Sequence, residues 1–203
     1  PAKYRYIGKP VPRLDIPAKV DGTAIFGIDV RLPEMLIATV RNVPIFGGAV
    51  ASFNAAAVRD LPGMEGVMEV PGGIAVAADS YWHAKTALDA LPVEWHPGPD
   101  AATTSDALFA RFATALDADD ESKIQDEGDA EDELASAGRI VAAEYRVPHL
   151  AHATMEPQTC TALVTSERCE IWVGTQVPDF VQAVAEDITG LSGDEITLHT
   201  TYL

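Results

Sequence analysis

The chain has 203 residues, of which 47% are hydrophobic, and its 31 acidic against 14 basic residues give a formal net charge of −17. This length and hydrophobicity argue against global disorder, and the strong negative field argues against nucleic acid and anionic membrane surfaces as partners. No apolar run approaches the roughly 20 residues that span a bilayer.

The first 22 residues are predicted to form an extended arm. They contain five basic residues together with Pro10, Pro12 and Pro17, and proline at this density disfavours a helix. Enrichment in β-branched residues then predicts strands over residues 23–30 and 35–41.

The next segment alternates short helices with turns and strands. Asn54 is the expected N-cap of a helix over residues 55–60, and Ser80 that of a helix reaching about residue 91. Between them, the turn Pro71-Gly72-Gly73 separates two strand-like runs at residues 66–70 and 74–78. With a further short strand at residues 93–95, this order predicts an α+β domain with a largely antiparallel sheet over residues 20–97.

Residues 98–137 are predicted to hold one helix and an acidic linker. Leu108, Phe112 and Leu116 recur at four-residue steps and share one face of a helix over residues 103–116. Residues 117–133 contain ten carboxylates and a single lysine, a composition that repels itself and stays solvated. The spacing of an EF-hand calcium loop is absent, which disfavours a calcium site.

A second unit is predicted from about residue 138. Alternating residues indicate strands at 140–147, 159–164 and 170–173, with a turn at 165–168. Pro178 is expected to open a helix that Gly190 ends, followed by a final strand at 195–202. The predicted apolar stripe of this helix consists of Val177, Val181, Val184, Ala185 and Ile188. Cys160 and Cys169 lie in two of these strands; we expect two buried thiols, and a hairpin disulfide is the alternative.

The common motifs of self-contained enzymes are missing, including GxSxG, GxGxxG, GxxxxGK[ST] and HExxH. On a helix, His149, His152 and Glu156 would have a spacing suited to metal ligands. However, Pro148 and Pro157 flank the segment and disfavour a long helix, so locally hydrogen-bonded histidines are the preferred interpretation. A Ser-His-Asp hydrolase site stays an alternative without a nucleophile elbow to support it.

Two compact segments concentrate polar side chains in apolar, proline-bounded surroundings: residues 149–157 and 172–178. Gln176 comes just before the predicted helix start, where backbone N–H groups and the helix dipole favour an oxygen-rich ligand. Plain capping and turn chemistry is the alternative explanation of this second segment.

Seven stretches, in this order and spacing over nearly the whole chain, resemble one known family. They are residues 6–10 (YIGKP), 13–22 (RLDIPAKVDG), 24–29 (AIFGID), 71–77 (PGGIAVA), 93–95 (VEW), 155–157 (MEP) and 174–178 (GTQVP). The chain resembles the molybdenum-binding large subunit of the xanthine dehydrogenase and aldehyde oxidase family. It is most similar to the bacterial branch of isoquinoline 1-oxidoreductase beta subunits and membrane-bound aldehyde dehydrogenases.

The resemblance implies an arm at residues 1–19, the family's hammerhead domain at 20–97 and a connecting helix and linker at 98–137. Residues 138–203 would form the start of an α/β molybdopterin-binding domain. Family members continue into a glycine-rich GGGFG loop after the strand that matches residues 195–202, whereas this chain ends at Leu203. We therefore expect a truncated fragment that is inactive and binds no cofactor by itself.

The resemblance further implies that the parent protein hydroxylates an aldehyde or an N-heterocycle with oxygen taken from water. It would use a molybdopterin-type cofactor in the cytosine dinucleotide form and pass electrons to an iron–sulfur or cytochrome c partner. Related chains are periplasmic or attached to the periplasmic face of a membrane. A non-catalytic module that only docks subunits is the alternative from a different functional class.

Site residues also follow from the resemblance. Gln176 matches the family glutamine that hydrogen-bonds an oxygen ligand of molybdenum, and an amide suits this role because it donates without adding charge. Gly174 and Thr175 would accompany it at the cofactor, while His152 and Glu156 would border the substrate cavity. No residue of the chain is expected to ligate the metal directly.

Overall fold

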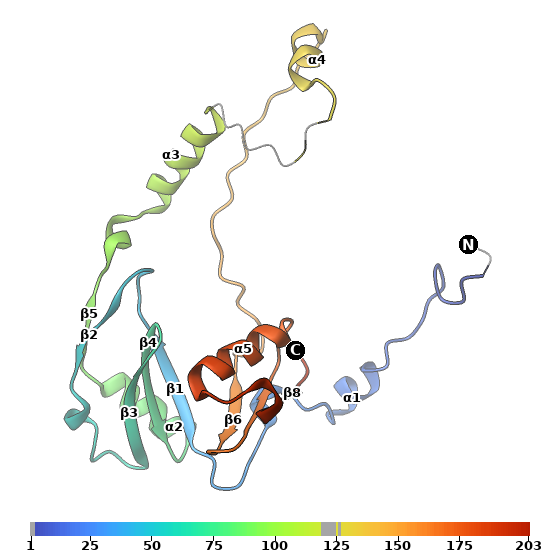
Figure 1. Cartoon of the computed structure of the whole chain (residues 1–203). Helices are drawn as coiled ribbons and strands as arrows, with labels where there is room; N and C mark the ends of the chain where they lie inside the picture. The colour runs from blue at the N-terminus through green and yellow to red at the C-terminus, as the bar shows by residue number, and fades with distance from the viewer. Residues whose placement is uncertain (1–2, 119–124, 126) are drawn as a thin grey trace. The chain divides into compact units, whose positions relative to one another are not determined.

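The computed structural model of the chain describes residues 3–118, 125 and 127–203. These residues form two compact units, one made of Pro1–Pro33 together with His152–Leu203 and the other of Glu34–Ala151. Both units combine helices with small sheets (Figure 1), in which every pair of described strands except β7–β8 is antiparallel, and this confirms the predicted α+β class. No helix among the described residues is long and apolar enough to cross a membrane.

The unit Glu34–Ala151 contains two small antiparallel sheets. One has the order β1 (Ile37–Asn42), β4 (Gly73–Ala78) and β3 (Met64–Val70). In the other, β2 (Ala49–Phe53) pairs with β5 (Val93–His96). The strands expected near residues 35–41, 66–70, 74–78 and 93–95 are confirmed, whereas β2 was not predicted.

The turn between β3 and β4 follows from its sequence. Val70 pairs with Gly73, which leaves Pro71 and Gly72 as a two-residue connection, and Gly72 has a φ of 73° that favours glycine. Gly73 lies against β1, because a Cβ atom there would stand 2.5 Å from the carbonyl oxygen of Arg41. Because Gly73 has no Cβ atom, β1 can lie close enough to pair with β4, which pairs with β3 on its other side.

Helix α2 (Tyr81–Ala90) covers this sheet with its Ala84, Ala87 and Leu88 side. The resulting core consists of apolar side chains that are at least 96% buried: Val58, Ile74, Val76, Ala87, Leu88 and Leu91. Burying one large aliphatic side chain contributes roughly 1.5–3 kcal/mol, so this cluster is the main source of stability in the unit.

Among the described residues, four further helical elements complete this unit: η2 (Ala55–Ala57), η3 (Pro99–Ala102), α3 (Ser105–Leu116) and α4 (Ala130–Ser136). A groove of about 310 Å³ lies between α3 and residues 144–147. Leu116 stays 84% exposed on the predicted apolar face of α3, so this face is only partly covered. The predicted acidic linker includes residues 119–124 and 126, which lie outside the described residues.

The predicted strand at residues 140–147 is wrong. The backbone of this segment belongs to no strand, and Val141 and Tyr145 are 81% and 87% exposed. Alternating apolar residues favour an extended chain, but a strand also needs a neighbour to hydrogen-bond with, and the described residues supply none here.

The unit formed by Pro1–Pro33 and His152–Leu203 is built on a three-stranded sheet. Its strands β6 (Cys160–Val164) and β7 (Cys169–Val173) are antiparallel, while β8 (Ile196–Thr200) lies parallel to β7. Helix α5 (Pro178–Thr189) and the short η4 (Gly193–Glu195) connect the parallel pair. The turn at 165–168, the helix start at Pro178 and the left-handed Gly190 after its end are all as predicted.

Two expectations about the N-terminal arm are corrected. Residues Ile16–Asp21 form a short helix, α1, in which Pro17 occupies the first turn, where proline is tolerated. Residues 23–30 form no strand; their centre is a single 3₁₀ turn, η1 (Gly27–Asp29). The turn forms because the Asp29 carboxylate accepts a hydrogen bond from the Phe26 amide at 3.0 Å and folds the chain back.

The register of β6 and β7 excludes the alternative of a hairpin disulfide. Cys169 pairs with Val164 and Cys160 pairs with Val173, at opposite ends of the hairpin. Four strand residues separate the two positions by about 13 Å, whereas a disulfide needs Cα atoms within about 7 Å. Both thiols are free: Cys169 is buried as predicted, and Cys160 is exposed, contrary to expectation.

Candidate functional site

The candidate site is the loop that joins β7 to α5. Because β7 and β8 are parallel, their carboxyl ends lie at the same edge of the sheet. At this edge β7 leads into Gly174, Thr175 and Gln176, and β8 leads into the segment 201–203. Ligands of sheets with helical crossovers bind outside the carboxyl ends of the parallel strands.

Gly174 lets the two chain segments at this edge approach closely. A Cβ atom at Gly174 would lie 2.9 Å from Leu203 Cδ2 and 3.1 Å from the Tyr202 carbonyl oxygen. One residue earlier, the Val173 carbonyl accepts a hydrogen bond from the Thr201 amide at 3.2 Å. Any larger residue at position 174 would push the loop away from the segment 201–203.

Thr175 fixes the loop from within. Its hydroxyl oxygen accepts a hydrogen bond from the Val177 amide at 3.0 Å, and Pro178 then begins α5. Val177, the N-cap residue, provides no side-chain cap, so no side chain of the cap shields the first amides of the helix. The Gln176 side chain is exposed beside this helix start.

This donor set fits an uncharged oxygen acceptor. The Gln176 amide donates hydrogen bonds without a charge, and the uncapped helix start adds partial positive charge. Asp179 in the first turn of α5 opposes a phosphate, because its carboxylate would repel the anion. The loop therefore suits a neutral oxygen acceptor better than a phosphate group.

The structure does not join His152 or Glu156 to this loop by a hydrogen bond among the described residues. His152 is exposed in an extended segment. Glu156 is half-buried, and its Oε1 accepts a hydrogen bond from the Ile28 amide at 3.1 Å. The Thr154 hydroxyl donates to the Glu156 carbonyl at 2.7 Å and holds the backbone at this point.

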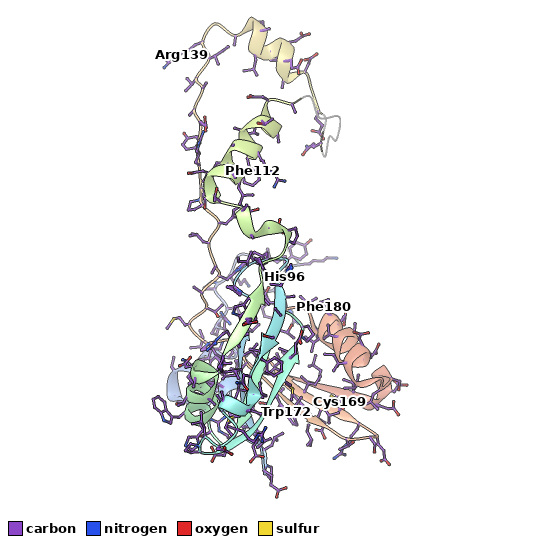
Figure 2. The ribbon with its side chains drawn as sticks, turned by 90° about the vertical axis from the view of Figure 1, so that its left-hand side faces the viewer. His96, Phe112, Arg139, Cys169, Trp172 and Phe180 are labelled. Carbon is purple, nitrogen blue, oxygen red and sulfur yellow. The ribbon has the colours of Figure 1, made fainter. Side chains whose placement is uncertain are left out.

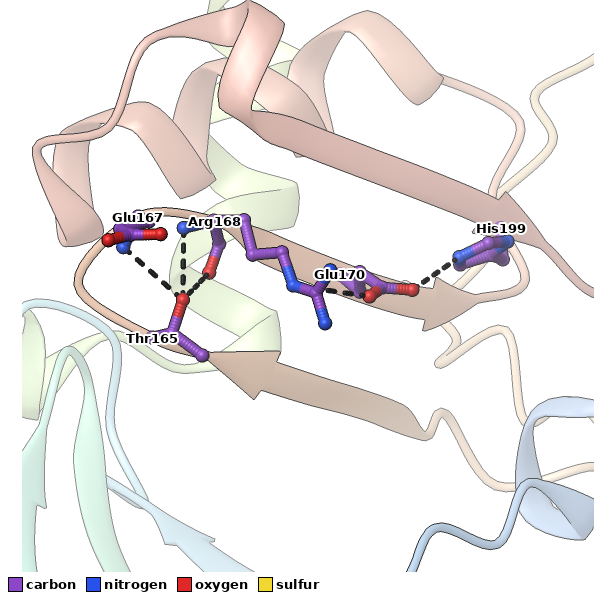
Figure 3. Close-up of polar contacts among 5 residues, drawn as sticks. All are labelled: Thr165, Glu167, Arg168, Glu170 and His199. Carbon is purple, nitrogen blue, oxygen red and sulfur yellow. Dashed lines mark hydrogen bonds and ion pairs between the residues drawn. The ribbon is translucent and has the colours of Figure 1, made fainter.

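A polar cluster on the sheet face opposite α5 was not predicted (Figure 3). His199 Nε2 lies 3.2 Å from Glu170 Oε2, and Arg168 Nε lies 3.7 Å from Glu170 Oε1. The rings of Trp172 and His199 stack with centroids 4.7 Å apart. The alternation of side chains along β7 could have indicated this cluster. Cys169, Ile171 and Val173 face α5, which leaves Glu170 and Trp172 on the other side of the sheet.

The structure gives no support to a metal site made by protein side chains. In the part of the chain that it describes, no three His, Cys, Asp or Glu side chains converge on one point. His149 instead stands edge-on to Phe112, with ring centroids 6.0 Å apart.

Comparisons with known proteins agree on one family. The molybdopterin cofactor-binding domain family matches residues 116–203. Isoquinoline 1-oxidoreductase subunit beta of Brevundimonas diminuta is 32% identical over 97% of this chain and 26% of its own length. Membrane-bound aldehyde dehydrogenase (pyrroloquinoline-quinone) of Gluconacetobacter polyoxogenes is 31% identical over 80% of this chain and 22% of its own length.

Among solved structures, quinoline 2-oxidoreductase from Pseudomonas putida 86 has the same fold. It matches with a TM-score of 0.69 and 19% identity over 96% of this chain and 30% of that chain. The chain thus spans about a quarter of the length of the curated relatives it matches. Together, the family match and the two curated relatives show that the chain belongs to the molybdenum-binding large subunits of the xanthine dehydrogenase and aldehyde oxidase family.

Proposed function

We propose that the protein to which this chain belongs is a molybdenum-dependent oxidoreductase that hydroxylates an aldehyde or an N-heterocycle. The names of the two curated relatives support these two substrate classes. The observation that carries the proposal is the position of residues 174–176, at the carboxyl edge of β7 and within the matched cofactor-binding domain. When bound, the cofactor supplies the two-electron oxidation, and water supplies the oxygen atom.

The loop residues have distinct roles in this proposal. Gln176 donates a hydrogen bond from its amide to an oxygen atom of the cofactor. Gly174 keeps the loop close to the segment 201–203, and Thr175 holds the backbone of Val177 so that Gln176 keeps one orientation. A donor held in place in this way stabilises charge that grows on the acceptor during the reaction.

The surroundings of the site are proposed from the same resemblance. His152 borders the substrate cavity, together with Glu156, and residues 20–97 form the hammerhead domain. The cofactor is of the cytosine dinucleotide form, and the electrons leave through an iron–sulfur or cytochrome c partner. The designation of one relative as a beta subunit supports a partner subunit, and that of the other as membrane-bound supports a membrane-associated, periplasm-facing location.

A quinone cofactor is the second candidate, because the name of the aldehyde dehydrogenase relative specifies pyrroloquinoline quinone. The match of residues 116–203 to a molybdopterin-binding family favours molybdenum. Extraction and mass analysis of the cofactor from the full-length protein distinguish a pterin from a quinone directly.

The substitution Gln176→Ala in the full-length enzyme tests the proposed role. Loss of one donor of this kind typically lowers kcat by about 10²–10³-fold. Gln158→Ala is the matched control, because Gln158 is an exposed glutamine of the same unit. We expect the control to keep its kcat with isoquinoline and with a simple aldehyde.

The kcat, the melting temperature and the molybdenum content are measured on the same preparation of each variant. If Gln176 only supports the helix start, its loss costs about 1 kcal/mol of stability and leaves kcat unchanged. An unchanged kcat at full molybdenum content would therefore remove Gln176 from the site. Incorporation of isotopically labelled oxygen from the solvent into the product tests water as the oxygen source.

A further inference from the structure

We propose that Glu156 is a positioning residue: its carboxylate holds the turn η1 in place, and this turn holds the backbone of Tyr202 against which the candidate loop packs. The importance of this arrangement for the enzyme rests on the proposed cofactor role of residues 174–176. The arrangement itself is a property of the chain alone and is testable without any cofactor.

The first link is the hydrogen bond from the Ile28 amide to Glu156 Oε1, 3.1 Å long, which joins residues 128 positions apart in the sequence. A carboxylate acceptor makes such a bond roughly twice as strong as a neutral one. Glu156 is itself fixed, because its carbonyl accepts from the Thr154 hydroxyl. The carboxylate thus faces η1 from a constrained backbone.

The second link is steric. Gly27 is buried in η1, and a Cβ atom there would lie 2.6 Å from Thr159 Oγ1 and 3.6 Å from Glu156 Oε1. Only glycine lets the turn approach Thr159, the residue before β6, this closely. The turn is also closed internally, since the Phe26 amide donates to Asp29 Oδ2 at 3.0 Å, so it moves as one piece.

The third link runs from the turn to the candidate loop. Phe26 and Tyr202 form a parallel bridge, with ring centroids 5.8 Å apart, and the Tyr202 amide donates to the Ile25 carbonyl at 3.3 Å. The carbonyl oxygen of the same Tyr202 lies 3.1 Å from the position that a Cβ atom of Gly174 would take. Displacement of η1 therefore moves the Tyr202 backbone that lies against Gly174.

This role differs from that of a substrate-binding carboxylate in one testable respect. An acceptor for the Ile28 amide needs an oxygen atom but no charge, so glutamine can replace Glu156. A group that binds a substrate or moves a proton through its charge cannot be replaced in this way. The conservative variant Glu156→Gln therefore separates the two roles.

Residue-resolved amide hydrogen exchange of the 203-residue chain tests the proposal. In Glu156→Ala, we expect the exchange of the Ile28 and Tyr202 amides to accelerate by about tenfold to a hundredfold, the range for a lost hydrogen bond to a charged group. Glu156→Gln should stay within a few-fold of the wild type. Glu167→Ala is the matched control, because Glu167 is an exposed glutamate of the same unit whose side chain lies in the hairpin turn.

A second pair of variants keeps the test decisive if Glu156→Ala fails to fold. Gly27→Ala should displace the turn without altering the carboxylate and accelerate exchange of the same two amides. The additional substitution Thr159→Ala removes the atom that a Cβ would strike and should restore protection. Proper folding of each variant is checked by the protection of β7 amides.

Two results would overturn the proposal: a Tyr202 amide that stays protected in Glu156→Ala and in Gly27→Ala, or a Glu156→Gln variant that exchanges like Glu156→Ala. Neither depends on molybdenum. If the exchange pattern is as expected but the full-length protein contains no molybdenum, the proposed function fails and the positioning role stands. If molybdenum is present but the exchange is unaltered, only the positioning role fails.

Discussion

Cys160 and Cys169 lie on neighbouring strands but in opposite environments. Cys169 is 1% exposed on the face of β7 that packs against α5, and Figure 2 labels it together with Phe180 of α5. Cys160 is exposed. Burial raises the pKa of both thiols, so access of a reagent to the sulfur atom, rather than acidity, separates them. The two thiols should therefore differ strongly in reactivity.

We expect a thiol reagent such as dithionitrobenzoate to modify one cysteine rapidly in the folded chain and the second only after unfolding. Cys160→Ser should abolish the rapid phase and leave the slow one. Two rapid phases would mean that the packing of α5 on β7 is wrong, and the absence of any reaction before reduction would indicate a disulfide.

Asp15 is the acidic residue of the arm with the strongest electrostatic perturbation. The hydrogen bonds from the Arg13 guanidinium and from the Lys19 ammonium lower the pKa of the Asp15 carboxyl from 3.8 to about 2. Since the folded-state pKa is lowered, these contacts stabilise the arm fully above pH 3.8, and this contribution is lost as the pH falls through about 2.

A carbon-detected titration of the Asp15 carboxyl by NMR should give a pKa of about 2 in the wild type. Arg13→Gln should move it toward 3.8, because the largest contributor is removed. Arg5→Gln removes an equal charge from the same arm without losing a hydrogen bond to Asp15 and should leave the titration in place. An Asp15 pKa that is the same in both variants would contradict the observed pairing.

At the scale of single residues, local chemistry was predictable and distant chemistry was not. Pro178 and Gly190 mark the two ends of α5 as their backbone preferences require. The bond between Glu156 and the Ile28 amide could not be anticipated, because it joins positions 128 residues apart. The backbone preference of a residue depends on its own side chain, whereas its distant hydrogen-bond partner depends on the fold.

Helix caps give a test at the scale of the element. Ser80 and Asn54 have similar capping preferences, but only the Ser80 hydroxyl accepts a bond, from the His83 amide at 3.3 Å. Ser80→Ala should lower the free energy of unfolding by about 1 kcal/mol, while Asn54→Ala should stay within about 0.5 kcal/mol of the wild type. Denaturant unfolding of the chain measures both, and equal losses would show that the cap at Ser80 is not formed.

Helix α5 was predicted correctly in extent and only partly in its packing. Val181 and Ala185 face the sheet as expected from the apolar pattern, yet Ile188, assigned to the same stripe, is 72% exposed. Phe180, which was not assigned to the stripe, is 67% exposed. The apolar residues of α5 cover more of its circumference than one three-stranded sheet can bury.

Strands illustrate the same division between local and distant information. The β3–β4 hairpin was predictable, since the turn at Pro71 and Gly72 places β4 directly beside β3. Strand β2 was missed because Ala49, Ala51 and Ser52 give it a weak β-propensity. The segment 140–147 has a strand-like pattern without a partner in the described structure, so the pattern alone misleads.

At the scale of the whole molecule, one unit combines the first 33 residues with residues 152–203. Composition marks the acidic stretch between them, but nothing in a single sequence shows that the chain returns to its beginning. The candidate site depends on this return, because the Ile25 and Phe26 backbone pairs with Tyr202 beside the loop. Family resemblance identified the loop residues, and the structure adds what supports them.

Elemental analysis of the full-length protein tests most directly whether the chain is part of a protein that holds molybdenum. The protein would be produced in a host that makes molybdopterin cofactors and purified with its partner subunits. We expect near-stoichiometric molybdenum together with a pterin released on denaturation. A folded and active preparation that contains pyrroloquinoline quinone, or that oxidises its substrate without molybdenum, would show that the protein is not a molybdenum enzyme.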